Sequence, residues 1–162
     1  MKTKIFITIS CLILAGFVFG QNKQPGKAEI KAAKVESKIQ SGAYEITVSQ
    51  VSPMGGMTRY LTPDYSVRIS GDSAYVYLPY FGRAYSAPMN GEGGIKASTT
   101  MDNYQVDYKN GKNYSIRFST KGTNDTYRFS ISLWTNGKAS INVACNNRQP
   151  ISYFGELILP EK

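Results

Sequence analysis

The chain contains no histidine, and this absence removes the side chain that most often acts as a general base and as a transition-metal ligand. Catalytic triads and dyads that depend on histidine are therefore excluded. Cys145 lies on the same apolar face of a predicted strand as Ile141 and Val143. This position predicts a buried and inert thiol. A zinc site would need this thiol together with carboxylates alone, an unusual ligand set. We expect no metal and no cofactor.

Carboxylates are the remaining route to catalysis. Glycoside hydrolysis requires two carboxyl groups that face one cleft about 5 to 10 Å apart. The chain has eleven acids, but Glu45 and Asp107 fall on the polar faces of predicted strands and Asp72 falls in a predicted turn. The sequence shows no catalytic constellation, so we expect a protein that is not an enzyme and keep a carboxylate-based hydrolase as an alternative.

The densest group of side chains suited to binding lies in residues 78–85. Pro79 removes a backbone donor and ends the preceding strand, and Gly82 permits a sharp turn. Mixtures of tyrosine and arginine dominate binding hot spots, so the candidate ligand-binding residues are Tyr80, Phe81, Arg83, Tyr85 and, from a distant loop, Arg148. In the alternative interpretation the stretch is structural, with Phe81 in the core and Arg83 in a salt bridge.

The rest of the chain must position this stretch, and its pattern is that of β-strands. Apolar residues alternate with polar ones from Tyr44 onward, with a period of two. Asn110 with Gly111, and Asn136 with Gly137, separate such runs and predict tight hairpins. A bulge or bend is plausible at Gly155. Strands are predicted at residues 44–49, 65–70, 74–78, 104–108, 114–119, 127–133, 141–145 and 151–159.

Strands that are apolar on one side and joined by hairpins form antiparallel sheets. About eight to ten of them predict an all-β domain over residues 43–162, either a curved sheet closed as a lipocalin-like barrel or a sandwich. A barrel with a cavity would favour an apolar-ligand carrier. Tyr75 and Tyr77 point away from the predicted core, so either the N-terminal segment covers them or they form an exposed aromatic surface.

The N-terminal segment has two parts. Lys2 and Lys4 precede an apolar or hydroxylic run over residues 5–19, the pattern of a secretory signal peptide cleaved after about Gly20. Acylation at Cys11 is the competing prediction, but the residues before it form a poor lipoprotein box. Cleavage would lower the net charge from +8 to +6. Residues 21–42 are rich in lysine and predict a basic leader or a short helix, with Gly42 beyond its end.

Several stretches of the chain form a recognisable set: Leu61 with Asp64 and Tyr65, residues 71–73, 78–85 and 147–149, and residues 151–153 with Gly155. Together they resemble a secreted family from Bacteroidetes, domain of unknown function 4251. The likeness runs from about Ser41 to the C-terminus. It implies an envelope or secreted bacterial protein, and it supplies no activity, cofactor or catalytic residue.

Taken together, the sequence predicts an exported, periplasmic or secreted domain that binds a small molecule, a glycan or an envelope partner through Tyr80, Phe81, Arg83, Tyr85 and Arg148. An exported chain meets little nucleic acid, so none is expected as a partner. The apolar part of the signal peptide is shorter than the roughly 20 residues of a membrane span, so the protein is not expected to span a membrane. We expect a monomer.

Overall fold

The computed structural model describes residues 26–85, 93–122 and 125–160. The expected signal peptide with Cys11, the start of the leader and most of the glycine-rich loop around Gly91 lie outside these ranges. One helix precedes nine strands: α1 (Lys27–Gln40), β1 (Ala43–Pro53), β2 (Arg59–Tyr60), β3 (Ser66–Ser70), β4 (Ser73–Leu78), β5 (Ile95–Lys109), β6 (Asn113–Lys121), β7 (Thr126–Trp134), β8 (Lys138–Cys145) and β9 (Ile151–Leu157).

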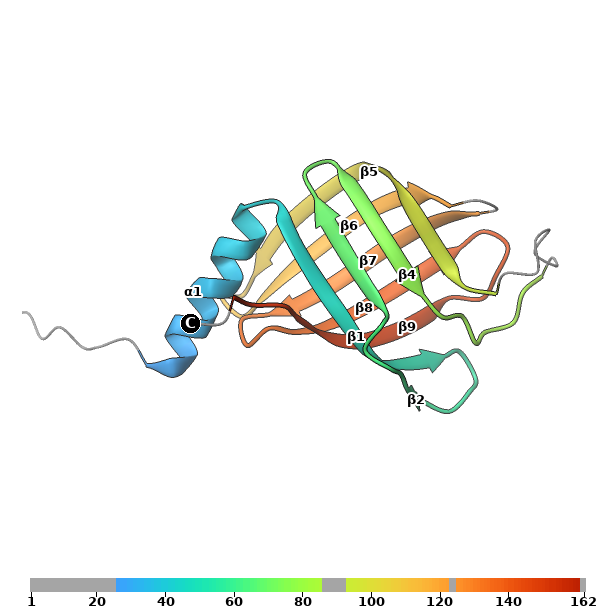
Figure 1. Ribbon diagram of the computed structural model, residues 1–162, viewed down its shortest axis with the longest axis horizontal. Helices are drawn as coiled ribbons and strands as arrows, with labels where there is room; N and C mark the ends of the chain where they lie inside the picture. Colours follow the sequence, from blue (N-terminus) through green and yellow to red (C-terminus); the bar gives the residue numbers. More distant parts are fainter. Residues whose placement is uncertain (1–25, 86–92, 123–124, 161–162) are drawn as a thin grey trace, which may run out of the picture.

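Eight of these strands form a closed antiparallel barrel (Figure 1). Strands β3 to β9 pair in chain order, and β1 pairs with β3 on one side and with β9 on the other. The short strand β2 adds to the end of β1. The predicted all-β fold is therefore confirmed in its barrel form, with one extra strand and the short N-terminal helix.

The predicted hairpin turns are present. Asn110 and Gly111 have φ values of 52° and 64° between β5 and β6, and Gly137 has a φ of 83° between β7 and β8. The side-chain oxygen Oδ1 of Asn136 accepts a hydrogen bond from the backbone N–H of Lys138 at 3.0 Å. Since asparagine and glycine adopt positive φ at low cost, these turns follow directly from the residues.

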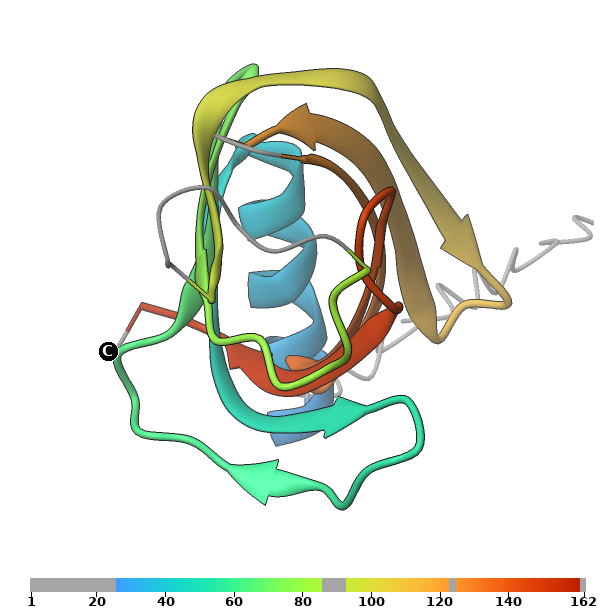
Figure 2. The same ribbon diagram turned by 90° about the vertical axis from the view of Figure 1, so that its right-hand side faces the viewer.

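Strand β5 turns a corner of the barrel, as its sweep across Figure 2 shows. Its first six residues, 95–100, pair with β4, and residues 101–109 pair with β6. The register shifts between Asp102 and Gln105, where Asn103 has a φ of 55°. The sequence predicted a strand only over residues 104–108. The first half of β5 was missed because Ile95 and Ala97 are its only clearly apolar inward residues.

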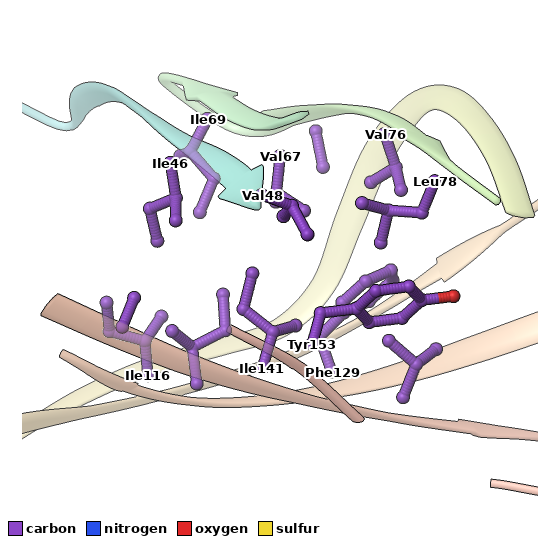
Figure 3. Packing of buried hydrophobic residues seen from close by; sticks show 14 of the residues in the cluster. Ile46, Val48, Val67, Ile69, Val76, Leu78, Ile116, Phe129, Ile141 and Tyr153 are labelled. Atoms are coloured by element: carbon purple, nitrogen blue, oxygen red, sulfur yellow. The ribbon is translucent and has the colours of Figure 1, made fainter. Parts of the chain in front are cut away.

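The barrel interior is filled by side chains. Figure 3 shows inward aliphatic and aromatic groups of opposite walls pointing toward one another across the barrel. A side chain beside a water-sized cavity would keep some accessible surface, yet Ile46, Leu78, Ile116, Ile141 and Tyr153 keep none. This packing is that of a hydrophobic core rather than of a ligand cavity.

Helix α1 lies at one end of the barrel, opposite the loops that follow β4 (Figures 1 and 2). Val35 is fully buried and Ile39 is 8% exposed, so the helix docks through these two side chains. The Glu29 carboxylate accepts a hydrogen bond from the Gly26 N–H at the first turn. Gly42, with a φ of 63°, follows the last turn, as the sequence predicted.

Gly155 of β9 lies at a close approach between β9 and β1. It faces the interior and pairs with Val48 of β1, next to a register shift between Val48 and Gln50. A Cβ atom at Gly155 would overlap the carbonyl oxygen of Thr47. The predicted irregularity is therefore present, as a bulge in the partner strand, and the missing side chain is what lets the barrel close.

We expect the change Gly155→Ala to destabilise the protein by about 3 kcal/mol or more, because the added methyl group meets backbone rather than a movable side chain. Urea unfolding measures this. Gly93→Ala is the matched control, since a Cβ atom there meets nothing within 4 Å. Equal stabilities of the two variants would contradict the role assigned to Gly155.

Candidate functional site

Residues 79–85, called the strap below, leave β4 and cross the end of the barrel opposite α1 (Figure 2). Their backbone pairs with the loop between β8 and β9, residues 146–150. Ala84 forms an isolated antiparallel bridge with Arg148. The Tyr85 N–H donates to the Asn147 carbonyl at 2.9 Å, and the Gln149 N–H donates to the Arg83 carbonyl at 3.0 Å. The strap is thus held by a short ladder rather than lying free.

Two of the predicted binding residues, Tyr80 and Arg148, meet beneath this ladder. The Arg148 guanidinium lies 5.3 Å from the centre of the Tyr80 ring, a cation–π distance. Its Nη1 atom donates to the carbonyl oxygens of Gly93 and Gly94, each at 3.1 Å, and only 6% of Arg148 is exposed. The Tyr80 hydroxyl donates toward the carbonyls of Arg83 and Gln149, at 3.0 and 2.9 Å. The Tyr80 hydroxyl therefore ties the strap to the loop between β8 and β9, and Arg148 supports the strap through its contact with the Tyr80 ring.

Two further buried groups fix the neighbouring backbone. The Tyr153 hydroxyl, which rises from the core, donates to the Pro79 carbonyl at 2.7 Å. The Asp125 carboxylate accepts the backbone N–H groups of Asn146 and Asn147 at 3.0 and 3.1 Å, as well as that of Thr126. Asp125 is 9% exposed. It holds the loop that carries Arg148, a role that no pattern in the sequence indicated.

Three groups at this end of the barrel have a raised pKa. Burial raises the pKa of the Tyr80 and Tyr153 hydroxyls, and the Arg148 charge offsets only part of the effect. Burial, reinforced by the Asp125 carboxylate, raises the pKa of the Cys145 thiol to about 11. Since the thiolate is the reactive form, this thiol is a poor nucleophile near neutral pH. The predicted burial of Cys145 is confirmed.

The other three predicted residues point outward. Phe81 is 44% exposed and Tyr85 is 66% exposed, and Arg83 is exposed as well. The Arg59 guanidinium of β2 lies 5.0 Å from the centre of the Phe81 ring. The structural alternative placed Phe81 in the core, and this part of it is wrong because the side chain is exposed. Arg59 was not predicted, because β2 has only two residues and no alternation to reveal it.

A second aromatic surface covers the outer wall of β3 and β4. Tyr75 and Tyr77 are 39% and 48% exposed, so α1 does not cover them. The ring of Tyr77 stacks on that of Tyr65 with centres 5.3 Å apart, and the Arg68 guanidinium lies 4.6 Å from the centre of the Tyr75 ring. Of the two outcomes left open by the sequence, the exposed surface is the correct one.

Within the described ranges, no group of three cysteine, aspartate or glutamate side chains could hold a metal ion. The buried polar side-chain atoms of the same residues all have hydrogen-bond partners, so none of them is aimed at an absent group. The helix that the structure describes is too short and too polar to cross a membrane.

Comparisons with known proteins agree on one family. The family model described as Domain of unknown function (DUF4251) matches residues 26–157. The crystal structure of a DUF4251 family protein from Bacteroides eggerthii DSM 20697 is similar, with a TM-score of 0.64 and 19% sequence identity over 80% of this chain and 88% of that one. At this identity the likeness supports the fold alone. No curated protein matches the chain.

We expect Arg148→Met to lower the free energy of unfolding by about 3 kcal/mol, because it strands buried carbonyl groups that the guanidinium now satisfies. The same change at exposed Arg83 is expected to cost less than about 1 kcal/mol. Urea unfolding of the two variants provides the comparison. Similar losses in both would show that Arg83 also has a structural role.

Stability should also depend on pH through Cys145. The thiol has a pKa of 9.0 when unperturbed and about 11 in the folded protein, so between these values the unfolded state loses its proton first. The contribution is complete below pH 9 and is lost as the pH rises toward 11. We expect the free energy of unfolding to fall between about pH 9 and about pH 11, and to fall less in Cys145→Ala. Parallel pH profiles would contradict this assignment.

Proposed function

The chain belongs to the DUF4251 family, and because that family name carries no activity, we propose from the site itself that the protein is an exported, non-enzymatic domain that binds a glycan or other envelope component through the strap. The binding surface consists of Phe81, Arg83 and Tyr85, with Arg59 beside them. The resemblance to this family seen in the sequence is confirmed.

One observation supports the proposal: buried polar side chains hold the strap in place, and the strap exposes large aromatic side chains to solvent. Burying an arginine is costly unless its donors are satisfied, yet Arg148 is buried under the strap. If the strap served only to close the barrel, its next residues would be expected to turn inward or to be small and polar. Instead the same segment presents Phe81 and Tyr85 to solvent. Rigid exposed aromatic and arginine side chains are the usual centres of binding surfaces.

The filled interior argues against an apolar-ligand carrier. A carrier needs a cavity that encloses most of its ligand, and the inward side chains here pack against one another across the barrel (Figure 3). Opening such a cavity would mean separating close-packed groups, at a cost of several kcal/mol. Binding on the outside of the barrel avoids this cost.

A hydrolase based on two carboxylates also has little support. Four depressions on the described surface are lined by at most one acid each: Glu156, Glu45, Glu36 and, in the fourth, none. Asp125 is occupied by three backbone N–H groups. The absence of histidine from the whole sequence removes the commonest substitute for a second acid.

The proposal is tested by screening the purified protein against isolated envelope polysaccharides and peptidoglycan fragments, with dissociation constants measured for those retained. We expect the double variant Phe81→Ala with Tyr85→Ala to weaken binding by about tenfold or more, because alanine removes both exposed anchors. Its free energy of unfolding should stay within about 1 kcal/mol of the parent.

Tyr60→Ala is the control, since Tyr60 is 84% exposed and lies on β2 outside the strap. Two results would reject the strap as a binding surface. One is unchanged affinity in the double variant for every retained component. The other is a loss of several kcal/mol of stability in that variant, which would make the side chains structural.

A further inference from the structure

A groove lies on the outer wall of the barrel where β7, β8, β9 and β1 are neighbours (Figure 1). It has a volume of about 460 Å³, and its lining includes Trp134, Phe154, Gln50, Lys138 and Glu156. None of the strap residues lines it. The groove is therefore separate from the surface proposed above and does not depend on that function.

The groove lies at the bulge in β1. In the pairing of β1 with β9, Ser49 is the extra residue between Val48 and Gln50. Ser49 and Gln50 both face outward, although a regular strand would turn one of them toward the core. Bulges re-aim side chains in this way and are common beside functional sites. Here the bulge presents a hydroxyl and a carboxamide side by side at the groove.

The two aromatic rings and the Gln50 carboxamide are available to a ligand. Trp134 is 40% exposed and Phe154 is 41% exposed. Within the described ranges, neither ring stacks on another ring or lies against a cation. The Ser49 hydroxyl donates to the Phe154 carbonyl at 3.4 Å, whereas the Gln50 side chain makes no hydrogen bond to another described residue. Large exposed apolar side chains gathered in a groove are typical of a binding site.

The charges in the groove balance. Lys138 of β8 and Glu156 of β9 lie opposite each other in register, and among the described lining residues they are the two that carry charge. A strongly acidic or basic ligand would meet a like charge beside each opposite one. An uncharged ligand with many hydroxyl groups avoids this repulsion. An ammonium donates hydrogen bonds to it, a carboxylate accepts them, and a carboxamide does both.

One strand separates the two aromatic side chains. Trp134 ends β7 and Phe154 lies on β9, with β8 between these strands. Since neighbouring strands lie about 4.8 Å apart, β7 and β9 are roughly 10 Å apart, a spacing wider than one sugar ring. Two successive units of a sugar chain match this spacing, whereas a single sugar reaches one aromatic ring at a time.

We propose that this groove binds an uncharged glycan across at least two successive sugar units. The two aromatic rings pack against the apolar faces of the sugars. Gln50, Lys138 and Glu156 exchange hydrogen bonds with the sugar hydroxyl groups. An extended peptide is a poorer fit, because the described strands are paired on both sides at the groove and strand addition needs a free edge. An acyl chain is a poorer fit as well, because such ligands bind in enclosed apolar cavities.

The chain has a single tryptophan, so tryptophan fluorescence reports on this groove alone. The full protein is titrated with cellohexaose, maltohexaose, mannohexaose and chitohexaose, and with a galacturonate hexamer as the charged probe. We expect at least one uncharged hexasaccharide to shift the emission and to reduce acrylamide quenching about twofold, because a sugar covers the Trp134 ring. Its monosaccharide should bind about tenfold more weakly or worse, and the galacturonate hexamer about fivefold more weakly or worse.

Calorimetric titration of variants with the same hexasaccharide locates the site. Trp134→Ala, Phe154→Ala and Gln50→Ala should each weaken binding by about fivefold or more. Tyr75→Ala and Gln105→Ala are the matched controls. Tyr75 is 39% exposed and Gln105 is exposed, and neither lines the groove. The controls and the double variant of the strap should bind like the parent.

The proposal is overturned if none of the uncharged hexasaccharides binds, or if binding leaves acrylamide quenching unchanged. Equal affinity for the monosaccharide or for the galacturonate hexamer also overturns it, as do equal losses in the control variants. The strap and the groove fail separately. Binding that is lost in the strap double variant but leaves Trp134 quenching unchanged rejects the groove and supports the strap. The reverse pattern supports the groove and rejects the strap.

Discussion

The buried guanidinium of Arg148 is the interaction on which the strap end of the molecule depends. A charge with 6% exposure is tolerated only when each donor finds an acceptor. Here the acceptors are backbone carbonyls that follow the strap in the chain, while the cation lies against Tyr80. Three distant segments are therefore tied together: the strap, the start of β5 and the loop before β9. Asp125 fixes that loop in turn.

In this arrangement, the residues that hold the strap in place are different from the residues that the strap exposes to solvent. The interior of the barrel is close-packed, and its end is closed by hydrogen bonds that involve buried tyrosines, an acid and an arginine. The binding that we propose would use side chains on the outside of the barrel, the aromatic and basic groups of the strap. A stable scaffold with pre-ordered exposed groups loses little entropy on binding. Affinity would then depend on a few side chains rather than on a rearrangement of the barrel.

Much of the fold could be read from the sequence, because alternation and Asn-Gly turns are local signals. The choice of barrel over sandwich could not, since it depends on pairing between β1 and β9 at opposite ends of the domain. In the candidate site, the exposure of Phe81 and Tyr85 and the partial burial of Tyr80 could not be told apart from the sequence, because all three lie in one irregular segment without periodicity. Arg148 was identified by type, but arginine is rarely buried, so its supporting position was visible only in three dimensions.

The closing pair of β1 and β9 has a consequence for how the barrel is made. The antiparallel pairing that runs from Ile46 with Leu157 to Pro53 with Ile151 joins the first barrel strand to the last. Every intermediate strand can pair with a neighbour in sequence, but the ring is incomplete until the final strand has been synthesised. Contacts so distant in the chain slow folding. The domain would thus stay open during synthesis, a condition compatible with the export that we propose.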